Sequence, residues 1–480
     1  MRLVLFPKYS YLSALLLLLV ALLITFCHRA AYFDEAWFAE QSFWLIREGK
    51  VRSELFRGYN GWENGIYVFH KLFIYAGALV MSVTGVSVAA SKLVSIFFGL
   101  LGGYLVWLYG KHESREQQWL SVLLYFGCGT LIRFMSVNRP ETMCMALGFA
   151  SYFALEPAKN SQPKVLLAGM LAGLAALTHL NGLIYLIAGA IWLVRNTGWR
   201  PTFLFVLTGA LTLSLYGLDA LLDGNMTVLM SQFFHDPATQ ENLHLPDKLA
   251  VLLDYHQVFF HSQNEAALTT LVLLGAIAFR KKIRLAQPLF FYTVLLIASF
   301  WLLTKSDTDI YFLLFVPWLA ILVAHWLVAY LPGQPAWQKT TAKILLVFYA
   351  LVAIIQIRDV IVENQTSPDT ETRNALLARY MPNKNTKVIA PIDFFFGQMD
   401  SYKIQGLTYY YLSERANKKI PLLAFFQSAN QNGVAYIISS HGKDANYNIP
   451  ADTPARISAY KRVFQDELNT IYARQSGDTQ

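Results

Sequence analysis

Long apolar runs separated by short polar turns recur along the chain from the N-terminus to about residue 358. A run of about 20 apolar residues is long enough for a helix to cross the hydrocarbon core of a bilayer. Eleven runs of this kind predict membrane-spanning helices, at 9–27, 88–110, 117–134, 140–156, 164–180, 182–195, 201–221, 264–279, 286–304, 309–330 and 341–358. The pattern therefore predicts an α-helical polytopic membrane protein with about eleven transmembrane helices.

A further apolar run, Ile66–Val83, decides the topology, because counting it as a span reverses the side of every later loop. If it does not span, five short basic loops share one side of the membrane: 111–115, 159–164, 195–200, 280–284 and 339–343. Cytoplasmic loops carry the excess of Lys and Arg, and His70 and Lys71 would be costly at membrane depth. We therefore predict that this run lies at the outer interface, with the N-terminus cytoplasmic and the C-terminus outside.

This topology predicts a membrane domain over residues 1–358 and an external domain over 359–480. The membrane domain carries two long external loops, 28–87 and 223–263. Within the tail, the pattern predicts alternating helices and strands, which is typical of a small α/β domain. The expected elements are a helix at 371–380, a strand at 387–390, a helix at 406–416 and a strand at 434–440.

The composition supports a membrane protein: 55% of the residues are hydrophobic and only 15% are charged, against about a quarter charged in soluble proteins. The net charge of +8 is concentrated in the short loops, where Lys and Arg set topology and meet anionic lipid headgroups. No nucleic-acid-binding module is present, so membrane lipids are expected partners and nucleic acid is not. The three cysteines match no zinc spacing, and the sequence predicts no metal site.

The first external loop is acidic at its start. Asp34 and Glu35 follow the first helix, residues 36–47 read as an amphipathic interfacial helix with Glu40 facing water, and Glu63 precedes the interfacial run. Adjacent carboxylates at a membrane boundary are costly unless they are solvated or paired. An alternative is that Asp34 and Glu35 simply cap the following helix, and that Glu63 is a solvated loop residue.

A second polar point, Asn138-Arg139-Pro140-Glu141, interrupts the apolar sequence on the same predicted side as Asp34. Pro140 suits the first position of the next helix. Arg139 and Glu141 could form a surface ion pair worth only about 0–1 kcal/mol. Ionisable residues between two membrane helices are also candidates for function by default.

Together these features resemble the GT-C membrane glycosyltransferases, and in particular their protein O-mannosyltransferase and aminoarabinose-transferase-like group. The resemblance implies a polyprenyl-phosphate-linked sugar donor and a hydroxyl acceptor on a protein, lipid or glycan. It implies that Asp34 is the general base that takes the proton of the acceptor hydroxyl. Glu35 and Glu63 would orient the acceptor or stabilise charge developing on the sugar. It also implies a bacterial inner membrane, with the C-terminus periplasmic or extracellular, and leaves a divalent metal cofactor open.

The sequence departs from this group at two cationic positions. Relatives often carry Arg three residues after the Asp and Lys directly after the second Glu, where this chain has Trp37 and Asn64. A Pro-Pro pair common after the second acid is also missing. The departing lipid phosphate needs cationic donors. The external-side candidates for binding the phosphate and sugar are Arg57, Lys71, Arg139, with Glu141 beside it, and His179.

Two other functions fit a polytopic chain. A multi-pass transporter or flippase also places charges within the membrane, and a non-catalytic scaffold would use the C-terminal domain to bind a partner. The charged residues gather at one face and no paired half-repeats with broken helices are present, which argues against a transporter. The pattern favours the transferase.

Overall fold

The computed structural model describes residues 8–26, 30–32, 34–156, 161–235, 245–283, 287–304, 308–416, 419–441 and 446–475. His28, where the first external loop is predicted to begin, and Arg284, in the fourth basic loop, lie outside these ranges. The chain forms two compact units. The helical unit comprises residues 1–28, 68–73 and 92–365, and the mixed unit comprises residues 29–67, 74–91 and 366–480.

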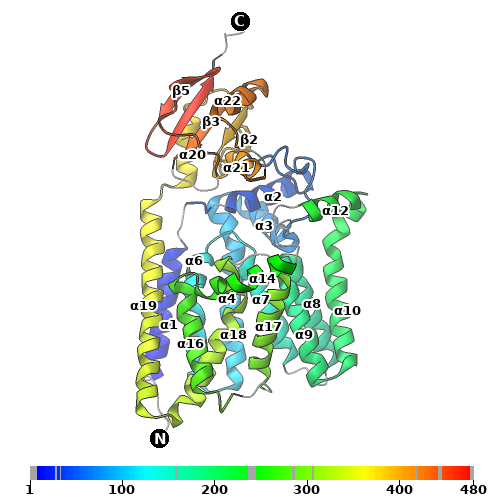
Figure 1. The fold of residues 1–480 in the computed structure, drawn as a ribbon, viewed down its shortest axis with the longest axis vertical. Coiled ribbons are helices and arrows are strands. Elements are labelled where there is room, and N and C mark those ends of the chain that lie inside the picture. The colour runs from blue at the N-terminus through cyan, green and yellow to red at the C-terminus, as the bar shows by residue number, and fades with distance from the viewer. Residues whose placement is uncertain are drawn as a thin grey trace. The chain divides into compact units, whose positions relative to one another are not determined.

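The helical unit is a bundle of apolar helices (Figure 1). The segment η4 (Asp309–Phe315) followed by α18 (Val316–Ala329) forms its centre, because nearly all of its side chains are buried. Around it lie α1 (Lys8–Thr25), α4 (Val88–Tyr109), η1 (Gly110–His112), α5 (Arg115–Phe126), α6 (Gly129–Phe134), α7 (Glu141–Leu155), α8 (Gln162–Thr178), η2 (Leu180–Gly182), α9 (Leu183–Asn196), α10 (Trp199–Ser214), η3 (Leu215–Gly217), α11 (Leu218–Leu222), α12 (Met226–His235), α14 (Leu245–Asp254), α15 (His256–Phe260), α16 (Gln263–Ala278), α17 (Pro288–Leu303), η5 (Leu331–Gly333) and α19 (Ala336–Thr366).

Each of the eleven runs predicted to span overlaps a helix. The run 117–134 divides into α5 and α6 at Gly127, and the run 309–330 begins as a 3-10 helix. Within the described residues, four helical stretches are long and apolar enough to cross a membrane by length and composition, and six shorter helices of 10–17 residues are also apolar. The predicted polytopic helical architecture is confirmed, while the number of spans stays a prediction.

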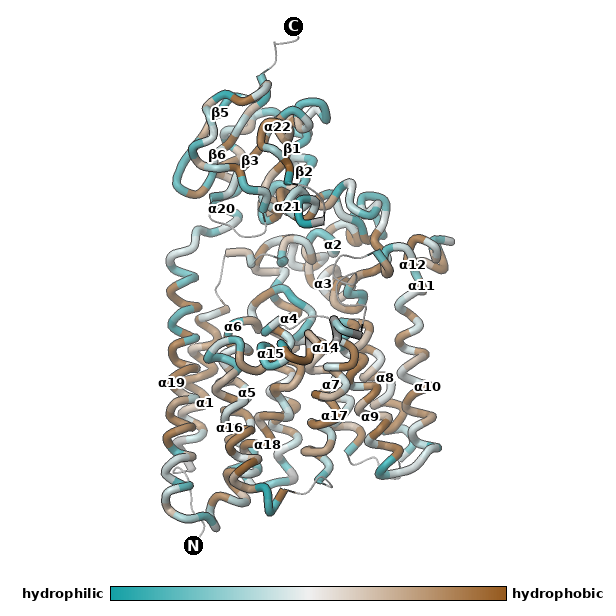
Figure 2. The backbone as a smooth tube through the Cα atoms, viewed as in Figure 1, coloured by the Kyte–Doolittle hydropathy of each residue, from teal (hydrophilic) through white to brown (hydrophobic). Residues whose placement is uncertain are grey.

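The helical unit is apolar on its outside as well as in its core (Figure 2). Large aromatic side chains such as Trp318 fill the core. Outward-facing side chains are also apolar: Leu17 on α1 is 72% exposed, Leu211 on α10 60% and Val347 on α19 58%. A helix bundle that is hydrophobic all round is typical of a protein embedded in lipid.

The C-terminal part of the mixed unit is an α/β domain. Its six-stranded sheet has the order β2-β1-β3-β6-β5-β4, with β1 parallel to β2 and β3 and the other pairs antiparallel. Phe426, Ile437 and Tyr472 lie in its core. The elements are α20 (Thr370–Ala378), β1 (Lys387–Ala390), η6 (Ile392–Phe395), β2 (Lys403–Gly406), α21 (Leu407–Ala416), α22 (Leu422–Gln431), β3 (Val434–Ser440), β4 (Arg456–Ile457), β5 (Tyr460–Gln465) and β6 (Asn469–Arg474). The predicted α/β class is confirmed.

The first external loop folds with this domain, although residues 92–365 lie between them in sequence. The loop contains α2 (Glu35–Glu48) and most of α3 (Lys71–Thr84). The backbone N–H of Gly406 donates to the carbonyl of Leu55 at 2.7 Å, and the rings of Phe43 and Phe395 meet edge-on at 5.7 Å. The C-terminal domain therefore supports the acid-bearing helix α2.

Candidate active site

The first turn of α2 holds the two acids in different surroundings. Asp34 is the N-cap residue and is partly exposed, and its side chain forms no capping hydrogen bond. Glu35 is fully buried, and its Oε2 accepts the backbone N–H of Tyr32 at 2.5 Å. Glu35 therefore fixes the chain as it enters the helix. The side-chain cap expected as an alternative role for Asp34 is not formed.

The prediction that Glu40 faces water is wrong, because its side chain is buried. Its carboxylate accepts hydrogen bonds from the hydroxyl of Ser53 (2.5 Å), the indole of Trp44 (3.1 Å) and the backbone N–H groups of Glu54 (2.6 Å) and Leu55 (3.0 Å). Burial raises the pKa of Glu40 to about 7, and these four hydrogen bonds oppose the rise. Glu40 thus ties the loop after α2 to the helix.

Glu40→Ala should destabilise the protein by about 2–4 kcal/mol, because it leaves the Ser53 hydroxyl and two backbone N–H groups buried without an acceptor. Glu40→Gln should cost less at pH 6. At that pH the buried carboxyl is largely protonated, because its folded pKa of about 7 lies above the ordinary value. For the same reason the contribution of Glu40 is fully present below its ordinary pKa and is lost as the pH rises through 7. Thermal unfolding of the two variants at pH 6 and pH 8 measures this, with Glu113→Ala, an exposed glutamate, as control.

Glu63 lies in a tightly wound loop. Its Oε2 accepts the backbone N–H of Gly58 at 3.0 Å. Gly58, Asn60 and Gly61 all have positive φ, at 88°, 46° and 68°, a region that favours glycine and tolerates asparagine. A Cβ on Gly58 would also lie 3.2 Å from the hydroxyl oxygen of Tyr409. The Glu63 carboxylate therefore holds this turn in shape.

The two positions where relatives carry cations have a structural explanation here. Trp37 stacks on Trp62, with ring centroids 5.5 Å apart and planes at 14°. Lys50, which the sequence analysis did not consider, places its Nζ 3.5 Å from the carbonyl oxygen of Asn64. A cation from the end of α2 is therefore present beside Asn64.

Arg57 is half exposed and pairs with Glu54, its Nε donating to Oε2 at 2.7 Å.

In the helical unit, Arg139 and Glu141 form a buried ion pair at the start of α7. Nη2 of Arg139 lies 3.0 Å from Oε1 of Glu141, and the Glu141 side chain is only 1% exposed against 18% for Arg139. Ser95 on α4 clamps the arginine backbone: its hydroxyl donates to the Arg139 carbonyl at 2.9 Å and accepts the Arg139 N–H at 3.2 Å. The pair is therefore not the surface contact that was left open as an alternative.

His179 lies against this ion pair together with His70, which the sequence analysis did not choose as a ligand. The two imidazole rings stack with centroids 4.7 Å apart, and both interact electrostatically with Arg139 and Glu141. Nδ1 of His179 accepts the backbone N–H of Asn181 at 3.0 Å. In the neutral ring the proton then sits on Nε2, so His179 can donate one hydrogen bond from that atom.

Burial lowers the pKa of His70 to about 3, with a smaller contribution in the same direction from His179 and opposition from Glu141. Because the unfolded chain binds this proton below its ordinary pKa of 6.5 and the folded chain does not, stability is present above pH 6.5 and falls as the pH decreases. The loss should be about 2 kcal/mol at pH 5. His70→Phe should flatten thermal unfolding profiles between pH 7.5 and 5. His256→Phe, at an exposed histidine, should leave the slope unchanged.

Lys71 follows His70 in sequence, but its side chain contacts different residues. Its side chain is 3% exposed and forms an ion pair with Asp219 on α11, and its Nζ lies 3.9 Å from the centroid of the Phe69 ring. Burial lowers the pKa of Lys71 to about 8, and Asp219 opposes the shift. Lys71 is therefore a charge already balanced by a carboxylate, whereas Arg139 lies with His179.

Solved structures similar to this chain share its architecture at low sequence identity. No protein-family model and no curated protein matches the sequence. The structure of ArnT from Cupriavidus metallidurans bound to undecaprenyl phosphate matches with a TM-score of 0.67, 12% identity and 98% of each chain covered. This chain has the GT-C fold. The mycobacterial arabinofuranosyltransferase AftD matches with a TM-score of 0.56 and 13% identity over 98% of this chain and 40% of that chain.

A third GT-C structure is the archaeal oligosaccharyltransferase AglB from Archaeoglobus fulgidus, in complex with an inhibitory peptide and a dolichol-phosphate. It matches with a TM-score of 0.53 and 12% identity over 90% of this chain and 69% of that chain. The expected GT-C resemblance is thus confirmed at the level of the fold.

Within the GT-C fold, the structure also draws attention to Lys92 on α4. Its side chain is 1% exposed, and it lies one helical turn before Ser95, the residue that clamps Arg139. A buried lysine in a membrane helix is a candidate for function by default. In the sequence, the signal for this residue is a single Lys within the otherwise apolar run 88–110.

Proposed function

We propose that this protein is a membrane glycosyltransferase. It would move a sugar from a polyprenyl-phosphate-linked donor to an acceptor hydroxyl on the non-cytoplasmic face. The observation that carries the proposal is the near full-length likeness to ArnT bound to undecaprenyl phosphate, combined with an aspartate at the first turn of α2. At low sequence identity, structural likeness shows a shared fold and not a shared activity. The reaction is therefore inferred from the fold and the residues together.

In the proposed reaction, the acceptor oxygen attacks the anomeric carbon of the donor sugar. The bond between that carbon and the phosphate oxygen breaks, and the lipid phosphate leaves with the electron pair. Asp34 takes the proton of the acceptor hydroxyl, which raises the nucleophilicity of the oxygen as the new bond forms. The partly exposed carboxylate at the N-cap of α2 suits this role. A helix N-terminus stabilises the charged, proton-accepting form of a carboxylate.

Glu35 and Glu63 are proposed as residues that hold this region in shape. Each carboxylate accepts a backbone N–H, from Tyr32 and Gly58 respectively. Substitution of either should therefore disturb the geometry around Asp34. Orientation of the acceptor by these two acids, as the resemblance implies, would act through that geometry.

The phosphate and the sugar of the lipid-linked substrate must be bound by side chains that donate hydrogen bonds. Arg139 offers a planar guanidinium suited to phosphate, and His179 offers one N–H from its neutral ring. Lys92 is added as a third candidate on the basis of its burial in α4. Arg57 remains a candidate with its charge shared with Glu54, and Lys71 is the weakest, because Asp219 already balances it.

The proposal is tested by offering the purified full-length chain a panel of polyprenyl-phosphate sugars that includes hexoses, pentoses and amino pentoses. We expect one donor to be consumed, with release of polyprenyl phosphate measured by mass spectrometry. Consumption should increase when a hydroxyl-bearing acceptor is added. If properly folded protein consumes no donor across the panel, the transferase proposal fails and a transporter or scaffold becomes the better explanation.

A further inference from the structure

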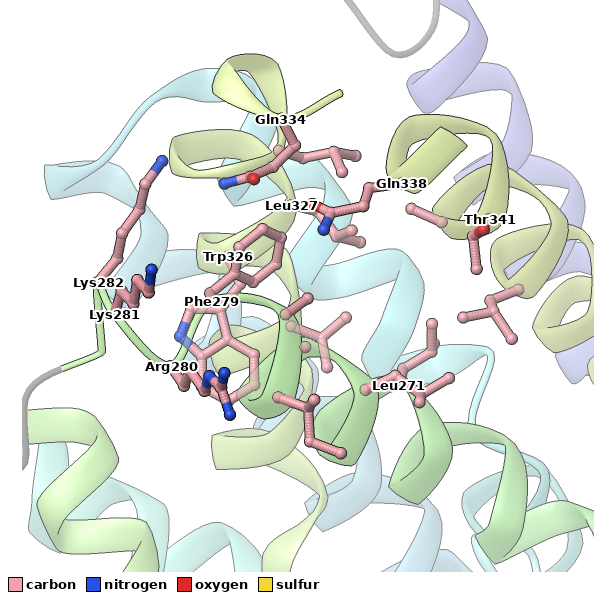
Figure 3. A pocket seen from close by; sticks show the side chains of 18 of the residues that line it. Leu271, Phe279, Arg280, Lys281, Lys282, Trp326, Leu327, Gln334, Gln338 and Thr341 are labelled. Atoms are coloured by element: carbon pink, nitrogen blue, oxygen red, sulfur yellow. The ribbon is translucent and has the colours of Figure 1, made fainter. Parts of the chain in front are cut away.

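A lateral pocket lies in the helical unit at the end of the bundle that carries the basic loops. Its volume is about 650 Å³, which is within the range of small-molecule sites. The second half of α16, α18, η5 and the start of α19 form its walls (Figure 3). Most of the lining is apolar, contributed by side chains such as Leu271, Leu274, Leu327 and Leu345. None of the candidate active-site residues lines it.

Three cations in one turn line this pocket. Arg280, Lys281 and Lys282 follow Phe279, the C-cap residue of α16, and all three are exposed. Figure 3 shows them on one side of the pocket, with Gln338 and Thr341 of α19 on the other. Among the described residues that line the pocket none is acidic, so its positive charge is not balanced there. Lys282 is held partly in place, with its Nζ 3.5 Å from the carbonyl oxygen of Tyr330.

Two polar atoms of lining residues have no hydrogen-bond partner in the part of the chain that the structure describes. They are the indole Nε1 of Trp326, whose side chain is 1% exposed, and Oε1 of Gln338. Unpaired buried polar groups are costly. A ligand with both oxygen acceptors and a hydroxyl would give each of them a partner.

The rim of the pocket is apolar where the helices meet the surrounding lipid. Ile277 is 64% exposed and Trp337 is 66% exposed. Tryptophan is enriched at membrane–water interfaces, and the adjacent basic loop is one of those predicted to be cytoplasmic. The pocket thus combines a cationic mouth with an apolar groove, and the predicted topology would place them at the headgroups and the acyl chains of the cytoplasmic leaflet.

We propose that this pocket binds one anionic phospholipid. Its phosphate would lie at the Arg280-Lys281-Lys282 turn and one acyl chain would occupy the groove. An ester oxygen would accept the indole N–H of Trp326, and a headgroup hydroxyl would donate to Oε1 of Gln338. Polybasic segments near the cytoplasmic surface attract anionic lipid. A bound lipid would connect α16, α18 and α19, and it would stabilise this end of the bundle by binding only the folded state.

The test uses the full-length chain purified in a neutral detergent. Phosphatidylglycerol and phosphatidylcholine with identical acyl chains are added, and binding is followed by native mass spectrometry and by the shift in thermal unfolding. Phosphatidylglycerol should bind and raise the unfolding temperature, while phosphatidylcholine should bind much more weakly. Equal binding of the two lipids would overturn the proposal.

Charge variants locate the headgroup. Arg280→Gln/Lys281→Gln/Lys282→Gln should weaken phosphatidylglycerol binding by about 100-fold, as expected for the loss of three cations at a lipid surface. The matched control removes three exposed cations at η1 and at the starts of α8 and α10, with Lys111→Gln/Lys164→Gln/Arg200→Gln, and should bind normally. An equal loss in both triple variants would mean general surface attraction and would overturn the site. Lys281→Glu alone gives the same test if the triple variant does not fold.

A shape variant locates the acyl chain. Ala278→Trp fills the groove while keeping all three cations, and it should abolish the preference for phosphatidylglycerol. Val347→Trp, at an exposed α19 position outside the pocket lining, should not. Glycerol phosphate, which has no acyl chain, is the water-soluble control ligand. If it reproduces the stabilisation at the same concentration, the site binds a soluble phosphate and the lipid proposal is wrong.

Discussion

Asp34→Asn should lower the rate of sugar transfer by about 10²- to 10⁴-fold, the usual contribution of a general base. The substitution keeps the size of the side chain and removes its ability to accept a proton. Asp34 is partly exposed, and asparagine is also a favoured N-cap residue. The unfolding temperature should therefore stay close to that of the unsubstituted protein. The measurement is the release of polyprenyl phosphate from the donor identified in the panel, at saturating acceptor.

Two comparisons make the result specific to Asp34. Asp254→Asn alters an exposed aspartate at the end of α14 and should retain full activity. Glu35→Ala should lower stability as well as activity, because it removes the fully buried carboxylate that accepts the Tyr32 N–H. A rate within about threefold of the unsubstituted enzyme for Asp34→Asn would mean that another group takes the proton. A scaffold would show no such dependence on a single carboxylate.

The apolar pattern predicted most of the helical unit, because membrane helices must satisfy their own backbone hydrogen bonds and present apolar surface over their whole length. Each predicted run overlaps a helix for this reason. The strands β1 and β3 were also predicted with the observed bounds, since both are short apolar runs that lie buried within the sheet. Local sequence suffices where the environment is uniformly apolar.

The remaining strands could not be predicted from such runs. The burial of β5 alternates along the strand, but its residue types do not, since Arg462 is partly buried and Val463 is exposed. β2 has only four residues and β4 only two. Their position in the sheet is fixed by pairing with neighbours that lie elsewhere in the sequence. The pairing of the first external loop with the C-terminal domain is equally non-local, and no feature of residues 29–67 alone indicates it.

The candidate site was predicted in its residue types but not in its contacts. The acids at 34, 35 and 63 and the Arg139–Glu141 motif stand out because charge is rare in this sequence. The burial of Glu40 does not follow from helical periodicity, because three of its four donors come from residues 53–55. His70 and Lys50 acquire their neighbours only through tertiary contacts. Sequence identifies the charges, and packing decides which of them meet.

Arg139→Met should both destabilise the protein and abolish transfer. The substitution leaves the carboxylate of Glu141, only 1% exposed, without the guanidinium that lies 3.0 Å away. Removing one partner of a buried ion pair typically costs about 3–5 kcal/mol. If the guanidinium also contacts the donor phosphate, loss of that contact should lower the transfer rate by a further 10²- to 10³-fold, as for other electrostatic ligands of a transition state. Thermal unfolding and donor consumption measure the two effects separately.

The double variant Arg139→Met/Glu141→Gln separates structure from chemistry. Neutralising Glu141 removes the unpaired buried charge, so most of the lost stability should return. Activity should not return, because no cation remains at that position to contact the phosphate. Recovery of both stability and activity would show that the pair only holds α7 against α4, through Ser95. In that case the donor phosphate must depend on other cations, and Lys92 becomes the first residue to substitute.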